Sequence, residues 1–264
     1  MLRQRMLTDE QWAKIEPSLP QLKSRGRPWR ESREVVEGIL WILRTGARWR
    51  DLPELFPSPA TCWRRLQRWE EDGTWKKVWR VFLSELDQRG RLDWEETFAD
   101  ATFSPAKKGG DAIGKTKRGK GTKCLVVVEG QGVPLGVSVH SASPAEVTLV
   151  EDTLKTIAVP RGGRGRPRSR PGRLIADTAY DSDPLRSRLA RRGIELIAPH
   201  RVNRRKLKTQ DGRKLRRYRR RWKVERTFAW LHNYRRLLVR WERHVKMFLA
   251  FIHVACILIT LRAL

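Results

Sequence analysis

The stretch WEETFADATFS, residues 94–104, decides the fold that we expect for this chain. Apolar and polar residues alternate around Phe98 and Phe103, which is the pattern of a half-buried strand. Two β-branched stretches follow, KCLVVVEG (123–130) and PLGVSVHS (134–141), and the GQGV that joins them is typical of a hairpin turn. The three stretches together predict three consecutive antiparallel strands.

Helix and strand patterns alternate after these three strands. In chain order they are a helix (144–157), a short buried strand (173–177), a helix (183–193), another strand (194–199), a long basic helix (214–240) and an apolar helix (244–262). This order predicts an α/β domain with an RNase H-like mixed sheet and flanking helices. In such a core the first and fourth strands lie side by side at the centre of the sheet.

Residues 1–92 have helical patterns and are expected to form a small all-helical domain ahead of the α/β domain of residues 93–264. Thr8 is expected to cap the first helix, and Gly46 to end a largely buried second helix. The proline-rich stretch that follows separates two short helices, as in a helix-turn-helix unit.

The second helix of this unit, capped by Ser58 or Thr61, has a basic face. The arginines that we expect on its outer side, against DNA, are Arg64, Arg65 and Arg68. A helical hairpin without any role in DNA binding would have the same pattern, and this alternative stays open.

The composition indicates a polyanionic partner. The 264 residues include 57 Lys and Arg against 29 Asp and Glu, which gives a net charge of +28 at pH 7. Nucleic acid is the simplest partner for such an excess, and a merely solubilising basic surface is the alternative. Two segments rich in Gly, Pro and positive charge, 107–121 and 160–173, are expected to be linkers that become ordered on a phosphate backbone.

Several classes of protein are disfavoured. The three cysteines are far apart and odd in number, so neither a disulfide framework nor a zinc site is indicated, and a reducing cytoplasm fits. The first residues lack the apolar run of a secretory signal. The apolar run near the C-terminus, MFLAFIHVACILITL, is shorter than a membrane span requires, so we expect a buried helix and no membrane partner.

Three acids are the candidate catalytic and metal-binding residues. Asp100 lies in the first strand and Asp177 ends the fourth, and neighbouring strands are about 4.8 Å apart, so the two carboxylates could share a cation. The third candidate is Glu225, a single acid in the arginine-rich stretch YRRRWKVERTFAW (218–230). Carboxylates are the ligands that Mg²⁺ prefers, and a pair of Mg²⁺ ions can activate a hydroxyl for attack on a phosphodiester. An ordinary ion pair is the alternative for Glu225.

Other acids and histidines compete for these roles. Asp181 and Asp183 are the rivals of Asp177, although Asp183 is expected to cap the next helix, and Glu242 is the rival of Glu225. The acids expected to be exposed charges at the sheet edge are Asp93, Glu95 and Glu96. The histidines His140, His200 and His253 are not spaced as a set of metal ligands.

The chain resembles the bacterial insertion-sequence transposases of the DDE type. One branch of that family has the pattern Tyr, two residues, Arg, three residues, Glu, six residues, Lys, and Tyr218, Arg221 and Glu225 match it in register. His232 stands where the family has Lys. The family's two aspartates resemble those of FADATF and IADTAYDSD, although Ala-Tyr replaces the family's Gly-Tyr after the second.

The resemblance implies a transposase that hydrolyses the phosphodiester at transposon ends and joins the 3′-hydroxyl to target DNA. It implies Asp100, Asp177 and Glu225 as ligands of two Mg²⁺ ions, for which Mn²⁺ would substitute. The residues expected to contact DNA phosphates in this region are Tyr218, Arg220, Arg221, Lys223 and His232. Double-stranded DNA, as terminal inverted repeats and as target, is the expected partner. A homodimer or larger oligomer is expected, in the bacterial cytoplasm and at the nucleoid when bound to DNA.

Two other functions would use the same features. A DNA-binding regulator, or a catalytically inactive domesticated transposase, would keep the helix-turn-helix unit and lose the chemistry. A nuclease or resolvase would cut on the same core without joining the 3′-end to a target. Cleavage and strand-transfer assays separate the three.

Overall fold

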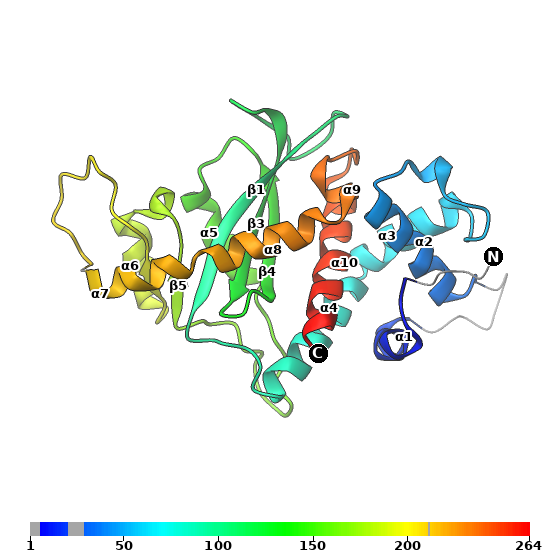
Figure 1. The fold of residues 1–264 in the computed structure, drawn as a ribbon, viewed down its shortest axis with the longest axis horizontal. Helices are drawn as coiled ribbons and strands as arrows, with labels where there is room; N and C mark the ends of the chain where they lie inside the picture. The colour runs from blue at the N-terminus through cyan, green and yellow to red at the C-terminus, as the bar shows by residue number, and fades with distance from the viewer. Residues whose placement is uncertain (1–5, 21–28, 211) are drawn as a thin grey trace.

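The computed structural model describes residues 6–20, 29–210 and 212–264. A helical part built from the N-terminal residues lies on one side and a mixed β-sheet on the other, and helices of the C-terminal region run between and across them (Figure 1). The core residues of both parts form one continuous apolar cluster.

The sheet has the topology predicted from the sequence. Its strands are β1 (Thr97–Pro105), β2 (Gly114–Thr116), β3 (Gly119–Glu129), β4 (Pro134–Ser141), β5 (Arg173–Ile175) and β6 (Glu195–Ile197). The order is β2–β3–β1–β5–β6, with β4 also paired to β3. β1 is antiparallel to β3 and parallel to β5, so the first long strand and the strand before Asp177 are neighbours at the centre. The predicted α/β fold class is confirmed.

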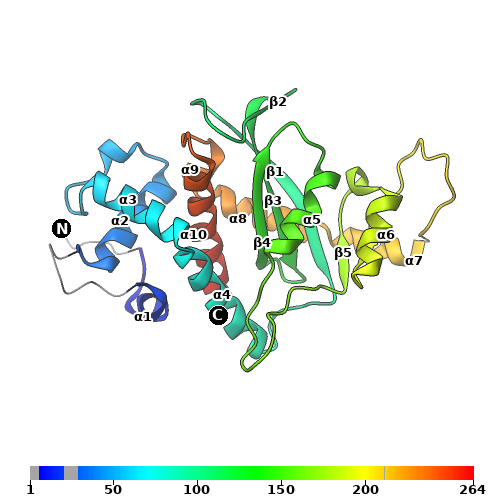
Figure 2. The same cartoon turned by 180° about the vertical axis from the view of Figure 1, so that it is seen from behind.

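Helices cover both faces of this sheet. On one face α5 (Glu146–Thr156) packs on β3 and β4, and α6 (Asp183–Arg191) packs on β6. On the other face α8 (Trp222–His232) crosses β1 and β3, as the views from the front and from behind show (Figures 1 and 2). The sheet therefore separates α8 from α5, and both helices pack on β1 and β3 from opposite faces.

The N-terminal helices begin and end largely as predicted. They are α1 (Asp9–Ile15), η1 (Glu16–Ser18), α2 (Ser32–Thr45), η2 (Trp49–Asp51), α3 (Pro59–Glu71) and α4 (Thr74–Gln88). Thr8 accepts a hydrogen bond from the Gln11 amide and caps α1, and α2 ends at Gly46 with φ of 71°. Ser58, one of the two predicted caps, accepts from the Thr61 amide at the start of α3.

The apolar C-terminal helix is α10 (Val245–Ala263), and its burial agrees with the prediction. Among the described residues it alone is long and apolar enough to cross a membrane, but 72% of its most apolar window is buried inside the protein, as in a core helix. The Trp79 indole donates to the Thr260 hydroxyl (3.1 Å), and Glu70 bonds to His253 (2.8 Å). Because the last helix shares a core with α3 and α4, the predicted boundary at residues 92 and 93 stays a prediction.

The prediction of one continuous basic helix over residues 214–240 is wrong. This segment contains α7 (Gly212–Leu215), the 3₁₀ helix η4 (Arg216–Arg220), α8 and α9 (Arg235–Leu238). In a 3₁₀ turn side chains three apart lie one above the other, which lets Arg217 and Arg220 both reach the Glu96 carboxylate. The tight turn thus exchanges α-helical hydrogen bonds for an ion-pair network that composition does not reveal.

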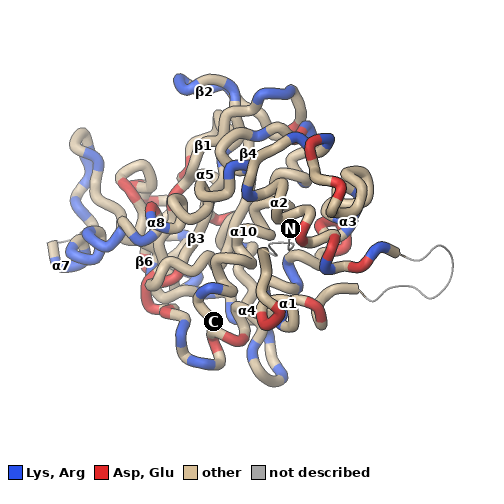
Figure 3. The backbone as a smooth tube through the Cα atoms, turned by 45° about the vertical axis from the view of Figure 1, so that its right-hand side comes forward, with Lys and Arg blue, Asp and Glu red and all other residues tan. Residues whose placement is uncertain are grey.

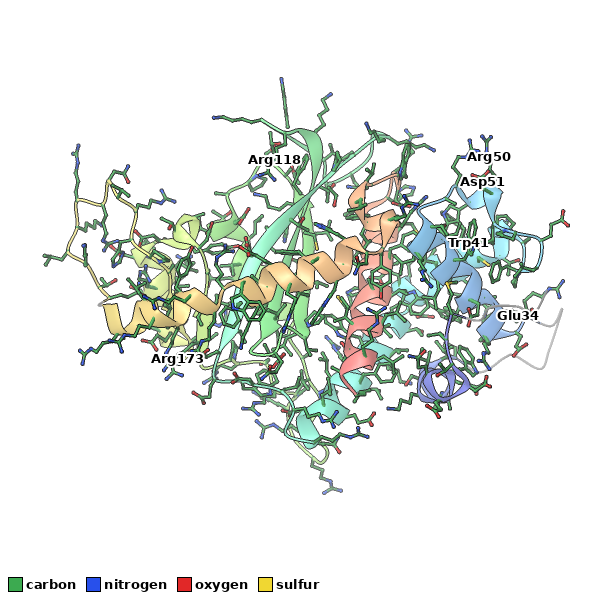
Figure 4. The ribbon with its side chains drawn as sticks, viewed as in Figure 1. Glu34, Trp41, Arg50, Asp51, Arg118 and Arg173 are labelled. Carbon is green, nitrogen blue, oxygen red and sulfur yellow. The ribbon has the colours of Figure 1, made fainter. Side chains whose placement is uncertain are left out.

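The first predicted linker is also more ordered than expected. Residues 114–116 of the segment 107–121 form β2, which pairs with β3 in a hairpin that projects from the sheet (Figure 2). Lys and Arg gather around this hairpin and along the loop that leads to α7 (Figure 3). Arg118 of the hairpin and Arg50 of the helical part lie along the same upper edge of the molecule (Figure 4).

Candidate active site

Asp100 and Asp177 lie at the same height on neighbouring strands. β1 and β5 are parallel, and Phe98 is paired with Ile175. Asp100 and Asp177 each follow their paired residue by two positions, so the register brings both to the carboxyl end of the strand pair. Asp177 accepts a hydrogen bond from the Ala179 amide (2.9 Å), which fixes its side chain at the start of a 3₁₀ turn.

The Asp100 carboxyl is in an unusual electrostatic environment. Burial raises its pKa to about 6, and the negative charges of Glu146 and Asp177 act in the same direction. The Ala101 amide and the Arg221 guanidinium lower the pKa, but less than burial raises it. A carboxyl that is desolvated among other carboxyls is one that a cation would stabilise.

Helix α8 brings Glu225 to this place. Arg221 lies one helical turn before Glu225 on α8. Its guanidinium donates to Asp100 Oδ2 (2.7 Å) and also to Glu225 Oε1. The Glu225 side chain is 54% exposed, so its carboxylate is accessible from solution. The guanidinium therefore bridges two of the three predicted acids.

The donor set fits a divalent cation in its chemistry. The oxygens of Asp100, Asp177 and Glu225 are hard ligands, and burial, with a smaller contribution from Glu146 and Asp177, raises the pKa of Asp100, so a cation would stabilise its carboxylate. Within residues 6–20, 29–210 and 212–264, however, no group of three or more His, Cys, Asp or Glu side chains is close enough together to hold a metal ion. Arg221 stands between Asp100 and Glu225, so the acids are neighbours without being gathered around one point.

His232 contacts the same strand as the acids. Its Nε2 is 3.1 Å from the Thr102 hydroxyl, and its ring packs on Phe228. Burial lowers the pKa of His232, so the ring is neutral at pH 7. A neutral imidazole can hydrogen-bond to a phosphate but does not supply the charge that a lysine would.

The other predicted phosphate contacts in this region are partly engaged within the protein. Tyr218 is half-buried, with the Arg221 guanidinium 5.8 Å from its ring. Arg220 pairs with Glu96, and Lys223 donates to the Gly130 carbonyl. We expected Glu96 to be an exposed edge charge, but it is buried because two arginines neutralise it.

The predicted basic face of α3 is only partly correct. Arg64 and Arg68 are exposed, as expected. Arg65 is buried, with its guanidinium 4.1 Å from the Trp29 ring and 5.1 Å from the Trp69 ring. Arg65 is therefore held in a cation–π stack and does not lie on the outer side of the helix.

The rival acids have partners of their own. Asp181 is bound by His200 and Arg186, and Asp183 pairs with Arg204 (2.9 Å). Ser182, rather than Asp183 as we predicted, caps α6, because its hydroxyl accepts from the Leu185 amide. Glu242 is buried against Arg236 (2.7 Å), which makes it a structural residue.

The sequence-based prediction missed Glu146. It is the first residue of α5, it accepts from the Tyr180 hydroxyl (3.3 Å), and its charge acts on Asp100. Strand order gives no signal for it, because the register places the end of β4 level with Ser104 and beyond Asp100; the hydrogen bond to Tyr180 is what connects α5 to the segment after Asp177.

Comparison with known proteins places these features in a family. The model described as "Transposase DDE domain" matches residues 95–260, and the model described as "Putative transposase of IS4/5 family" matches residues 7–79. Both agree with the resemblance that the sequence motifs indicate.

Two curated relatives are similar over about half of this chain. The putative transposase for insertion sequence element IS6501 of Brucella ovis (strain ATCC 25840 / 63/290 / NCTC 10512) is 39% identical over 146 residues, 53% of this chain and 98% of that protein. The putative transposase for IS402 of Burkholderia cepacia is 39% identical over 139 residues, also 53% of this chain, and the match spans 62% of that protein's length.

A solved structure has a similar fold. The piggyBac transposase in a synaptic complex with hairpin DNA aligns with a TM-score of 0.55 and 12% identity, over 96% of this chain and 70% of that one. At this identity the likeness concerns the fold alone.

Proposed function

Since the chain belongs to the insertion-sequence transposases with a DDE domain, we propose that it cuts the phosphodiester bond at transposon ends and joins the freed 3′-hydroxyl to target DNA. Asp100, Asp177 and Glu225 are the catalytic acids of this proposal. The observation that carries it is the shared guanidinium of Arg221, which holds Asp100 and Glu225 together although they come from a strand and a helix 125 positions apart in number.

Two Mg²⁺ ions, or Mn²⁺ in their place, would be held by these three carboxylates. Bound there, they would supply an activated oxygen nucleophile and stabilise the leaving oxygen. The chain itself supplies the orientation: Asp177 is fixed by the Ala179 amide and Asp100 by the Ala101 amide. Arg221 is positioned to donate to a phosphate oxygen when its carboxylate partners bind a cation instead.

DNA would be held by residues of α3 and by residues in and around the acidic site. Arg64 and Arg68 of α3 would contact one region of double-stranded DNA, and Tyr218, Arg221 and His232 the phosphates near the scissile bond. Arg220 and Lys223 contribute by releasing their present partners, Glu96 and the Gly130 carbonyl. Joining two ends requires at least two active sites, so we propose a homodimer or larger oligomer, acting on DNA in the bacterial cytoplasm.

Asp100→Asn and Asp177→Asn test this proposal. Each is expected to abolish Mg²⁺-dependent nicking of a transposon-end duplex while duplex affinity and Tm stay near those of the unaltered protein. Asp152→Asn is the matched control, because Asp152 is an exposed acid of α5 that pairs with Lys155 (2.7 Å). Nicking by the Asp100→Asn protein would contradict the assignment of this site. An unaltered protein that binds the duplex and never nicks it would favour a DNA-binding regulator.

A further inference from the structure

The beginning of α5 lies against the turn that follows Asp177, one of the proposed catalytic acids. β3 is antiparallel to both β1 and β4, so β4 runs parallel to β1, and its last residue, Ser141, is level with Ser104, four residues beyond Asp100. The chain leaves β4 at Ser141 and begins α5 at Glu146. α5 lies on the face of the sheet opposite α8 and packs against the 3₁₀ turn Thr178–Tyr180, which directly follows Asp177.

Two hydrogen-bonding partners direct the Glu146 side chain. The Tyr180 hydroxyl donates to Glu146 Oε2 (3.3 Å), and Tyr180 is fully buried three residues after Asp177. The Lys123 ammonium is 3.4 Å from Glu146 Oε1 and also donates to the Pro144 carbonyl (2.9 Å). The phenol therefore ties Glu146 to the segment that carries Asp177, and the Glu146 side chain remains 23% exposed.

The hydrogen bond from Tyr180 connects Glu146 to the segment of Asp177, and the electrostatics of the region agree with it. Burial raises the pKa of Tyr180 well above its usual value, and Glu146, Asp100 and Asp177 each raise it further. The buried phenol is hydrogen-bonded to Glu146, and the charges of Asp100 and Asp177 act on it as well. In the part of the chain that the structure describes, Asp177 has its backbone hydrogen bond and no ion pair, so these three acids are compensated only by Arg221 and Lys123.

From this arrangement we infer that Glu146 is a fourth carboxylate of the catalytic site, binding the divalent cation together with Asp100 and Asp177. The inference rests on the proposed function, because it adds a ligand to the same site. A carboxylate that accepts one bond from a neutral phenol keeps lone pairs for a cation. Lys123 retains the Pro144 carbonyl as a partner when Glu146 turns to the cation.

The alternative is that Glu146 only holds Tyr180 in place. Glu146→Gln distinguishes the two roles, because glutamine still accepts a hydrogen bond from the phenol but is a poor cation ligand. If Glu146 only tethers Tyr180, Glu146→Gln will not change cation binding. If Glu146 is a ligand, Glu146→Gln will weaken cation binding.

The direct measurement is binding of Mn²⁺ alone to the full-length protein, followed by electron paramagnetic resonance and by calorimetry. We expect Glu146→Gln to weaken Mn²⁺ binding by at least about tenfold, and Glu146→Asp to recover part of the loss. Glu151→Gln is the matched control: Glu151 is on the same helix and pairs with Arg188 (2.7 Å), away from the acids. It is expected to bind Mn²⁺ as the unaltered protein does.

Asp100→Asn, measured in parallel, separates failure of this inference from failure of the proposed function. If Asp100→Asn weakens Mn²⁺ binding and Glu146→Gln does not, Glu146 is not a ligand and the proposed function stands. If neither weakens it, the metal assignment of the whole site is wrong. If Glu151→Gln weakens binding as much as Glu146→Gln, only surface charge is being measured and the inference is overturned. Should Glu146→Gln not fold, as judged by Tm, Glu146→Asp and Glu146→Ala answer the same question.

Discussion

Two neighbouring segments of the chain combine arginines with a single glutamate and place them in opposite environments. In residues 216–232 the Glu225 side chain is 54% exposed and shares Arg221 with Asp100. In residues 235–244 the Glu242 side chain is 4% exposed, accepts a hydrogen bond from Arg236 and forms an ion pair with it. Composition alone does not distinguish the two segments.

Burial gives these similar residues different roles. Arg240 is completely buried, and its guanidinium donates to the Thr122 hydroxyl, to Asp111 and to backbone carbonyls, so it cannot exchange partners without leaving donors unsatisfied. Arg221 and Glu225 are partly solvated, so water, a phosphate or a cation can replace each partner at small cost. The exposed segment is therefore suited to a changing ligand, and the buried one to holding the fold.

The largest expected effect is on catalysis in the exposed segment. Glu225→Gln should lower the rate of Mg²⁺-dependent cleavage and strand transfer by about 10⁴-fold or more, as for loss of an essential catalytic group. Tm and duplex affinity should change little, because shape is kept and the side chain is exposed. Double variants with Asp100→Asn should be no slower than the single ones.

A Glu225→Gln protein that still cuts DNA would remove Glu225 from the site and make it an ordinary partner of Arg221. The difference in role between residues 216–232 and residues 235–244 would then disappear, since both glutamates would be structural.

Salt dependence of DNA binding is the next largest effect. If six to ten phosphates are neutralised, affinity should fall by about 10³–10⁵ between 50 and 200 mM salt. Replacing the exposed Arg219 with Gln should reduce the slope of the logarithm of affinity against the logarithm of salt concentration by about one. A flat response in the unaltered protein would contradict the polyanion role of this segment.

The buried segment should respond in stability rather than in catalysis. Glu242→Gln leaves the Arg236 charge uncompensated in the interior, which is expected to cost about 3–5 kcal/mol of unfolding free energy. Cleavage at a temperature where the variant is folded should be near normal. Denaturant unfolding measures the loss, and a change below about 1 kcal/mol would mean that the pair is effectively solvated.

The sheet and most helices were predictable because their signals are local. Alternation around Phe98, the cap at Thr8 and the stop at Gly46 each depend on a few neighbouring residues. The predicted strand order makes the strands of Asp100 and Asp177 neighbours and so allows the two residues to lie at the same level. The structure confirms that order.

What sequence could not predict depends on contacts between distant residues. The break at η4 requires Glu96, more than a hundred residues away, and the burial of Arg65 requires Trp29 from another segment. Glu146 was not predicted because the role that we propose for it depends on its contact with Tyr180, and a glutamate in the first turn of a helix is common.

A smaller effect is expected at Asp181, which like Glu242 is an acid enclosed by cations. Burial by itself would raise the pKa of Asp181, but Arg186, the Arg201 amide and His200 together lower it well below its usual value. The stabilisation is therefore present above the unfolded pKa and is lost as the pH falls below about 4. Asp181→Asn should cost about 1–3 kcal/mol at pH 7 and progressively less in acid, measured by denaturant unfolding across that range. A loss that does not depend on pH would mean that packing, and not charge, is the contribution of Asp181.

The smallest effect is expected on α3, which also combines exposed and buried arginines. Arg64 and Arg68 are exposed, and Arg65 is stacked between tryptophans. Replacing Arg64 and Arg68 with Gln should reduce discrimination between a transposon-end duplex and an unrelated duplex by about tenfold, the usual size of one or two base contacts. Arg65→Gln should instead lower Tm, because it removes the stacked guanidinium from a buried position. Competition binding against both duplexes at fixed salt measures the first effect, and thermal unfolding measures the second. If the Arg64 and Arg68 variant binds both duplexes more weakly by the same factor, these residues contact phosphates, and sequence is recognised elsewhere on the protein.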